Sequence, residues 1–214
     1  MKQAAVGFRT HSGWAAMVAV CVEKGAPEVL ARERVQLVEE FSYRFRQPYH
    51  TAERMKLEEA REFVKRVEVE AERLAFRAIS AAQSDLQKQG IQLTRCGVLL
   101  ASGRTLPEFE KILTSHALIH TADGELFREA LSRAAKRCGV ETVGIKEKEV
   151  LKSAQQALRV QPAALLRRVT ELGKPFGSPW SQDEKFATLA AWLMLTSNNS
   201  DAAKAPKNQK RDKA

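Results

Sequence analysis

The sequence is poor in cysteine and in long apolar runs. Its 214 residues include only Cys21, Cys96 and Cys138, which lie far apart among apolar neighbours. An odd number at that spacing favours buried free thiols over a disulfide framework or a cysteine-based zinc site. No run approaches the roughly 18 uninterrupted apolar residues of a membrane span, and the first residues lack the basic and then apolar layout of a signal peptide. We therefore expect a cytoplasmic protein.

Short motifs of several enzyme classes are also missing. The chain has no Walker-type phosphate loop, no Gly-x-Ser-x-Gly elbow and no Cys-x-x-Cys pair. Aromatic residues make up only 7%, and they alternate with positive charge only in residues 41–46, Phe-Ser-Tyr-Arg-Phe-Arg. This segment is predicted to be an edge strand with one basic face. The alternative is that it stacks on exposed bases, with Arg44 and Arg46 as phosphate contacts.

Positive charge is in excess. The chain has 35 Lys and Arg against 26 Asp and Glu, a formal net charge of +9. Residues 197–214 hold five of these cations and two of the acids, so this tail contributes +3 and the body +6. Such an excess suits nucleic acid, although a solvated basic face without a partner is the simpler alternative. We expect one domain, residues 1–196, and a disordered basic tail, 197–214, whose Lys207, Lys210 and Arg211 are candidate phosphate contacts.

The order of predicted elements changes after the first quarter of the chain. Strand-like runs cover residues 4–9, 14–22 and 29–38, and their short links favour an antiparallel meander. Apolar residues then recur at helical spacing from about Thr51 to before Gly90. A helix of about 35 residues exceeds the usual length, and partner binding along it is a further hypothesis.

Strands and helices alternate in the second half, which predicts parallel strand pairing through right-handed crossovers. The predicted elements are a strand at 91–101, a short helix opened by a Thr105–Glu108 capping box, a helix capped by Thr121, a strand at 140–145, helices at 147–159 and 162–173, and a last helix opened by a Ser181–Glu184 capping box.

This order and three local stretches resemble a known family. The stretches are Ala-Leu-Ile-His-Thr-Ala-Asp-Gly-Glu at 117–125, Val-Glu-Thr-Val at 140–143 and Lys-Glu-Lys-Glu-Val at 146–150. From Gly97 to Leu195 the chain is similar to the RuvC-like (Holliday-junction resolvase) branch of the RNase H-like superfamily. The resemblance implies an α/β fold: a mixed sheet of three antiparallel and then two parallel strands, flanked by helices, one of them unusually long.

The resemblance also implies four magnesium-binding acids, most of which are missing. Arg9 stands where the first strand should end in Asp, and residues 98–103, Val-Leu-Leu-Ala-Ser-Gly, contain no acid at the end of the fourth strand. In the last helix Asp183 matches one acid, Glu184 adjoins it and Phe186 occupies the second position. Because two-metal chemistry needs several carboxylates and a guanidinium repels metal ions, we expect no catalytic metal and no other cofactor.

Two roles are open for Arg9. The favoured one is an ion pair with Asp183 that replaces the metal bridge. In the other, Arg9 faces outward with His11 and Arg104 and binds a phosphate. The sequence thus predicts a non-catalytic RNase H-like domain that binds nucleic acid or a partner protein. A divergent, metal-dependent, structure-selective nuclease is the alternative, and it would need Glu39 or Glu40 beside Asp183.

His116 and His120 are spaced like metal ligands. On a continuous helix, residues four apart present both imidazoles on one face. Residues 114–116 look like a break between helices, however, so the two histidines are only weak metal candidates. The favoured prediction is a hydrogen-bonded helix entry in which His120 and Arg128 meet Glu125 or Asp123.

Overall fold

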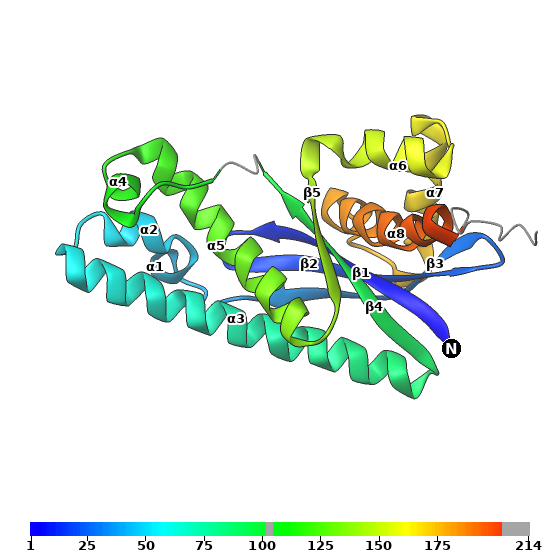
Figure 1. The fold of residues 1–214 in the computed structure, drawn as a ribbon, viewed down its shortest axis with the longest axis horizontal. Helices are drawn as coiled ribbons and strands as arrows, with labels where there is room; N and C mark the ends of the chain where they lie inside the picture. Colours follow the sequence, from blue (N-terminus) through cyan, green and yellow to red (C-terminus); the bar gives the residue numbers. More distant parts are fainter. Residues whose placement is uncertain (102–104, 203–214) are drawn as a thin grey trace, which may run out of the picture.

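A mixed five-stranded sheet forms the centre of the computed structural model, which describes residues 1–101 and 105–202, with side chains up to residue 196 (Figure 1). The strands are β1 (Lys2–His11), β2 (Trp14–Glu23), β3 (Ala26–Gln36), β4 (Ile91–Leu100) and β5 (Glu141–Lys146), in the spatial order β3-β2-β1-β4-β5. The first three pair antiparallel, whereas β4 is parallel to β1 and β5 is parallel to β4. The predicted α/β fold class is confirmed.

Two-residue turns set the register of the opening meander. His11 pairs with Trp14 and Glu23 with Ala26, so Ser12-Gly13 and Lys24-Gly25 are the turn residues. Gly13, Lys24 and Gly25 all have positive φ, which the tight turns between antiparallel strands require. The register then decides which strand residues face which layer of helices, since side chains alternate between the two faces of a sheet.

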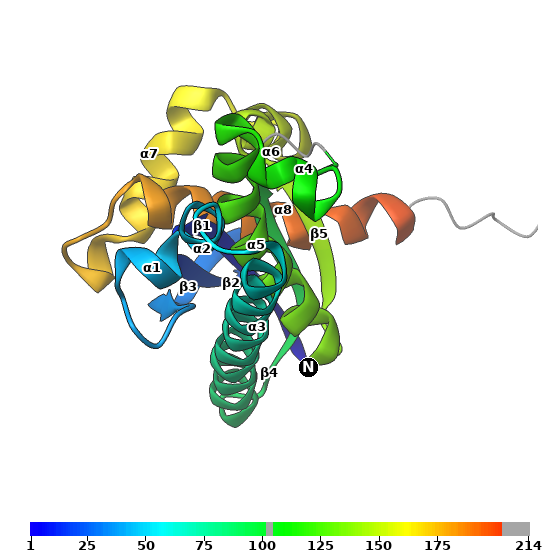
Figure 2. The same ribbon diagram turned by 90° about the vertical axis from the view of Figure 1, so that its left-hand side faces the viewer.

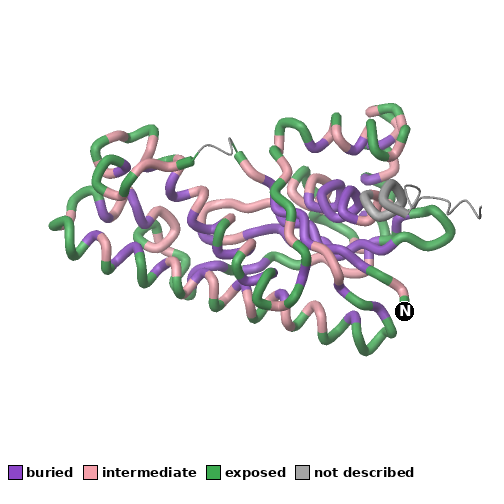
Figure 3. The backbone as a smooth tube through the Cα atoms, in the orientation of Figure 1, coloured by how far each residue is buried: buried purple, intermediate pink, exposed green. Residues whose placement is uncertain are grey.

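Two apolar clusters cover the two faces of the sheet. On one face Ala4, Val6 and Phe8 pack under α3 (Leu57–Lys88) and α5 (His116–Arg137). On the other face Ala5 and Val18 pack under α6 (Val150–Leu158), α7 (Pro162–Leu172) and α8 (Gln182–Ala202). Figures 1 and 2 show these layers, and Figure 3 shows the buried backbone concentrated in the strands and α8. Burial of both faces explains why β1 and β2 are almost continuously apolar.

Short helices account for the remaining ordered elements. They are α1 (Tyr43–Arg46), α2 (Pro48–Ala52), α4 (Phe109–Leu113), η1 (Glu147–Glu149) and η2 (Lys174–Phe176). The helices α1, α2 and α4 gather near the start of α5, at the left of Figure 1. Among the helices within residues 1–101 and 105–202, none combines the length and apolar character needed to cross a membrane.

Four boundary predictions are wrong. The long helix begins at Leu57 rather than Thr51, because residues 48–52 form the separate helix α2. Residues 41–46 end in the helix α1 and are not an edge strand. Thr121 lies inside α5, and α4 is preceded by Glu108 without a side-chain cap. The long helix, α4 and α5 are thus present but start at other residues than predicted, whereas residues 41–46 were assigned the wrong type of element.

Other local predictions are confirmed. The Ser181 amide donates to Glu184 Oε2 at 2.7 Å, and the Asp183 amide donates to Ser181 Oγ at 3.0 Å, so the capping box opens α8. All three cysteines are free as predicted; Cys21 and Cys96 are buried, whereas Cys138 is only partly buried.

Glycine allows α8 to lie directly on the sheet. A Cβ atom added to Gly7 would lie 1.9 Å from the carbonyl oxygen of Ala187, and one added to Gly97 would lie 2.9 Å from that of Ala190. Gly7 on β1 and Gly97 on β4 are paired neighbours. The two glycines therefore permit a backbone contact that brings the first turn of α8 to the end of β1.

Candidate functional site

Three elements meet at the carboxyl end of β1. Arg9 lies within β1, just after its fully buried residues 4–8, and the alternation of β1 places its side chain on the α8 face. One Arg9 Nη atom bonds Asp183 Oδ1, and the other donates to Glu147 Oε1 at 2.7 Å. His11 Nε2 lies 2.8 Å from the same Asp183 oxygen. Arg9 and Asp183 keep only 18% and 20% of their side chains exposed, so the ion pairs are partly shielded from water. We call these four residues the Arg9 cluster.

The pKa values of Arg9 and Asp183 are both shifted toward their charged forms. The hydrogen bond to Glu147 and the charges of Glu147 and Asp183 raise the pKa of Arg9, against the opposing effect of burial. Partial burial alone would raise the pKa of Asp183, but the hydrogen bond from His11 and the charges of His11 and Arg9 outweigh it and leave that pKa below its ordinary value. Both partners of the central pair are therefore charged at neutral pH.

The cluster does not fit the magnesium site that the resemblance implies. Two carboxylates, Asp183 and Glu147, approach one point, but the guanidinium of Arg9 bonds both of them. β4 is followed by Ala101, and the Phe186 ring lies 5.4 Å from the Arg9 guanidinium carbon. A divalent cation would have to displace a bound cation and would find few oxygen ligands.

The ion pair predicted between Arg9 and Asp183 is thus present, and Arg9 does not face outward. Arg104, its predicted companion in a phosphate site, lies outside the described residues. Glu147 was not predicted as a partner. A signal for it existed, since Glu147 directly follows β5 and the carboxyl ends of parallel strands lie at one edge of a sheet.

The acids proposed to assist Asp183 bond other residues or lie away from it. Glu39 Oε1 bonds Arg73, and its backbone amide donates to Glu70, so it belongs to the face covered by α3. Glu184 accepts from the Ser181 amide and hydroxyl. Glu40 is exposed just after Glu39, and no described contact brings it to Asp183. Within residues 1–101 and 105–196, neither Glu39 nor Glu40 is placed with Asp183 as the nuclease alternative requires.

An arginine-aromatic cluster lies beside the Arg9 cluster. The guanidinium of Arg34 lies 3.9 Å from the Trp14 ring centre and 5.6 Å from that of Phe41, and the Arg46 guanidinium lies 4.6 Å from the same Phe41 ring. His11 stacks on Trp14 with ring centres 4.4 Å apart, which links the two clusters. Arg34 and Phe41 are exposed.

A cavity of about 460 Å³ joins the arginine-aromatic cluster to Asp183. Its lining includes Trp14, Arg32, Arg34, Pro179, Asp183 and Glu184. Arg32 donates to the Phe176 carbonyl at 3.0 Å and also bonds the Pro179 carbonyl, so the loop before α8 holds its guanidinium in place. The lining of the hollow is mixed in charge, because the carboxylates of Glu33, Asp183 and Glu184 lie beside the guanidinium groups of Arg32 and Arg34.

The other predicted nucleic-acid contacts divide into two groups. Arg44 is exposed, with its guanidinium 5.0 Å from the Phe63 ring centre, and Tyr43 beside it is 61% exposed. Lys207, Lys210 and Arg211 lie outside the described residues. The arginine-aromatic cluster was only partly predicted, because Trp14 and Arg34 reach Phe41 through strand pairing and not through sequence proximity.

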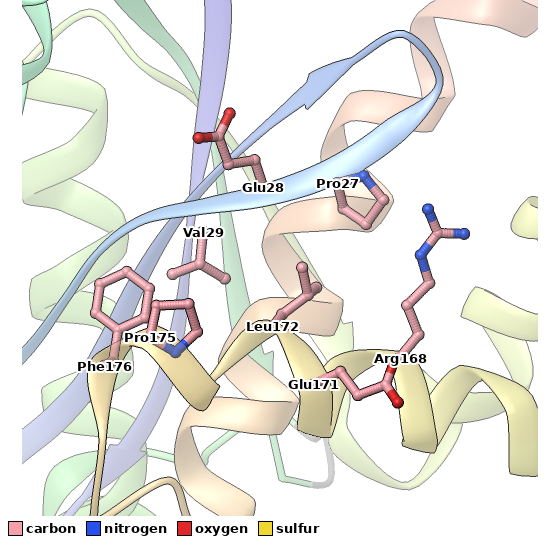
Figure 4. Close-up of a pocket in the computed structure, with 8 residues that line it drawn as sticks. All are labelled: Pro27, Glu28, Val29, Arg168, Glu171, Leu172, Pro175 and Phe176. Atoms are coloured by element: carbon pink, nitrogen blue, oxygen red, sulfur yellow. The ribbon is translucent and has the colours of Figure 1, made fainter.

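A second hollow, of about 490 Å³, lies between β3 and α7 (Figure 4). Pro27 and Val29 line it from β3, and Leu172, Pro175 and Phe176 line it from α7 and η2. Glu28 pairs with Cys21 and therefore lies toward the end of the sheet away from the Ser12-Gly13 turn. This mainly apolar hollow contains no member of the Arg9 cluster.

The two histidines of α5 do share one face. α5 begins at His116 and is continuous, and the Nε2 atoms of His116 and His120 lie 3.0 Å apart. The predicted pair of Arg128 with Glu125 is present at 3.2 Å. His120 meets neither acid, because Asp123 is bonded instead by His50 Nδ1 at 2.5 Å. His50 was not singled out from the sequence, and its neighbours there give no such signal.

The fold matches solved structures of one resolvase. No protein-family model matches the sequence, and no curated protein matches it. The structure of Thermus thermophilus RuvC superimposes with a TM-score of 0.52 at 12% identity, covering 92% of this chain and 96% of that one. T. thermophilus RuvC in complex with a Holliday junction substrate gives a TM-score of 0.53 at 11% identity, with the same coverage. The RuvC-like fold expected from the sequence is confirmed.

Proposed function

We propose that this chain, which has the fold of RuvC, is a non-cutting nucleic-acid-binding domain. Its binding surface is the arginine-aromatic cluster of Trp14, Arg34, Phe41 and Arg46, and Arg44 and the basic tail add further contacts. The observation that carries the proposal is the Arg9 guanidinium bound to both Asp183 and Glu147. That arrangement keeps the architecture around the end of β1 and replaces a metal centre with ion pairs.

The absence of cleavage follows from charge and from ligand number. Magnesium takes near-octahedral oxygen coordination, usually from carboxylates together with water and substrate phosphate. Two metal ions about 4 Å apart stabilise the attacking and leaving oxygens in this type of hydrolysis. Here one guanidinium bonds both carboxylates and cancels one of their two negative charges, so little net negative charge and few free carboxylate oxygens remain to bind magnesium.

Nucleic-acid binding is supported by the composition and placement of the exposed arginines. The formal charge of +9 favours a polyanion, and stacked guanidinium groups present donors that match phosphate oxygens. Phe41 and Tyr43 are 44% and 61% exposed and offer ring surface to unpaired bases. The solved relative bound to a Holliday junction makes branched DNA the first probe to test. We place this activity in the cytoplasm.

Binding and cleavage are measured together on the full chain. Fluorescently labelled four-way junction, duplex and single-stranded DNA, and single-stranded RNA, are titrated at about 50 mM salt and then at rising salt. We expect binding whose affinity falls steeply with salt, because each phosphate contact releases counterions. Incubation of the junction with magnesium or manganese is expected to leave it intact.

Two results would overturn parts of this proposal. If no nucleic acid binds at about 50 mM salt, the binding function is wrong, and a protein partner on the outer face of α3 becomes the better hypothesis. Light scattering then compares the mass of the wild-type chain with that of a variant altered at the exposed Val69 of α3. If pure protein cuts the junction and Asp183→Asn does not, the chain is a divergent nuclease.

A further inference from the structure

We infer that His50, His116 and His120 form a binding site for a divalent transition metal of the zinc class. The site is separate from the Arg9 cluster and does not depend on the proposed function. Three of the four histidines in the sequence meet here. One ring nitrogen of each lies within 4.8 Å of those of the other two.

The backbone brings these residues together from two elements. His116 and His120 are one turn apart on α5, and His50 lies on α2, which packs against α5 near its start (Figures 1 and 2). The three rings meet edge to face, with centres 4.3 to 5.3 Å apart and interplanar angles of 68° to 89°. The rings are therefore not stacked in parallel as His11 is on Trp14, and it is the closeness of their nitrogens that makes a shared ligand possible.

The spacing suits imidazole coordination. Nitrogens bound tetrahedrally at about 2.0–2.1 Å from zinc lie about 3.3 Å from each other. The 3.0 Å between Nε2 of His116 and Nε2 of His120 is close to this value. Two neutral imidazole nitrogens at that distance need a proton between them or a cation that accepts both lone pairs. Small changes of side-chain torsion bring the third nitrogen into range.

Asp123 fixes the third ligand in the way that metal sites require. Its Oδ2 accepts a hydrogen bond from His50 Nδ1 at 2.5 Å, and its Oδ1 accepts one from the Tyr49 amide at 2.7 Å. The side chains of His50 and Asp123 are only 9% and 5% exposed. A carboxylate bound to Nδ1 sets the tautomer that leaves Nε2 as a metal ligand. Asp123 is therefore a positioning residue, because its buried carboxylate orients the His50 ring for metal binding.

The site is open on one side. His116 and His120 are exposed, so three protein ligands leave further coordination positions toward solvent, as in non-structural zinc sites. His120 and Asp123 also line a cavity of about 250 Å³ whose other walls include Thr10, Ser12 and Arg128. A bound metal ion would thus lie next to the Ser12-Gly13 turn and near the Arg9 cluster.

Metal binding is tested with zinc and cobalt ions on the full chain. After incubation and dialysis, elemental analysis is expected to find one zinc per chain, and a competing chromophoric chelator gives the dissociation constant. The visible absorption of bound cobalt reports the coordination number. His116→Gln and His120→Gln are expected to weaken zinc binding at least 100-fold, whereas His11→Gln, at the remaining histidine, binds as the wild type does.

The Asp123→Asn variant tests whether Asp123 orients His50 for metal binding or only supports the fold. It is expected to weaken zinc binding about 10- to 100-fold, with a far-ultraviolet circular dichroism spectrum like that of the wild type. The two exposed histidine variants decide the question even if Asp123→Asn does not fold. Zinc absent after dialysis, or an unchanged dissociation constant in His120→Gln, would show that His50 and Asp123 only dock α2 onto α5.

Discussion

The guanidinium of Arg9 bonds the carboxylate of Asp183, which lies 174 positions later in the sequence. The pair joins the end of the first strand to the first turn of the last helix, and Glu147 and His11 complete it. The resemblance to RuvC-like nucleases implies a catalytic metal ion at this position. The same contact therefore bears on stability, on pH dependence and on the proposed absence of cleavage.

Removal of the Arg9 charge should destabilise the fold. Arg9→Met keeps much of the side-chain volume but leaves two half-buried carboxylates facing each other, which costs about 1–3 kcal/mol in the free energy of unfolding. Urea denaturation measures the difference. Arg133→Met is the matched control, because Arg133 and Glu129 are 50% and 57% exposed and such pairs contribute little. Equal losses in the two variants would contradict a special role for Arg9.

The stability of the chain should fall in acid through Asp183. Its pKa is lowered in the folded state from an ordinary value of 3.8, so the unfolded chain binds a proton more readily. The contribution is complete above that value and is lost as the pH falls through the lower, folded-state pKa. Asp183→Asn should remove this part of the pH dependence, measured as the unfolding free energy between about pH 5 and pH 2. Parallel curves for wild type and variant would refute the assignment.

Arginines of the arginine-aromatic cluster should contribute to nucleic-acid affinity. Each of Arg34→Ala and Arg46→Ala is expected to weaken binding on every sequence tested and to reduce the slope of log affinity against log salt by about 1. Arg137→Ala is the control, since Arg137 also lies over an aromatic ring, Phe76 at 4.8 Å, but sits at the end of α5. An effect of Arg137→Ala as large as that of the others would point to charge alone and not to a defined surface.

Glycine at the contact of β1 with α8 should be intolerant of substitution. Gly7→Ala places a methyl group 1.9 Å from the Ala187 carbonyl oxygen, and the strain costs about 1–3 kcal/mol or more. Gly124→Ala, inside α5, should have the opposite sign. There the new methyl group meets only the end of the Arg128 side chain, and alanine favours helix by about 1 kcal/mol. Thermal unfolding of both variants tests the pair.

Much of the fold was predictable because local sequence patterns specify its helices and strands. Apolar runs joined by short links predict the first three strands, helical spacing predicts α3, and the Ser181–Glu184 box predicts the start of α8. The departure from the carboxylate pattern was also visible, since Arg9 and Phe186 stand at positions where the resemblance implies carboxylates. The strand, helix and cap inferences need only a residue and its near neighbours in the chain, whereas this one needs the resemblance.

The sequence by itself determined the order of elements and the excess of positive charge, and through the family resemblance it favoured, but did not determine, the pairing of Arg9 with Asp183. Tertiary structure alone decided that Glu147 joins that pair, that residues 41–46 form no strand and that His50 meets His116 and His120. The reason is physical. Periodicity and caps depend on bonds within a few residues, whereas a contact between distant side chains depends on strand register and helix packing, which the whole core sets at once.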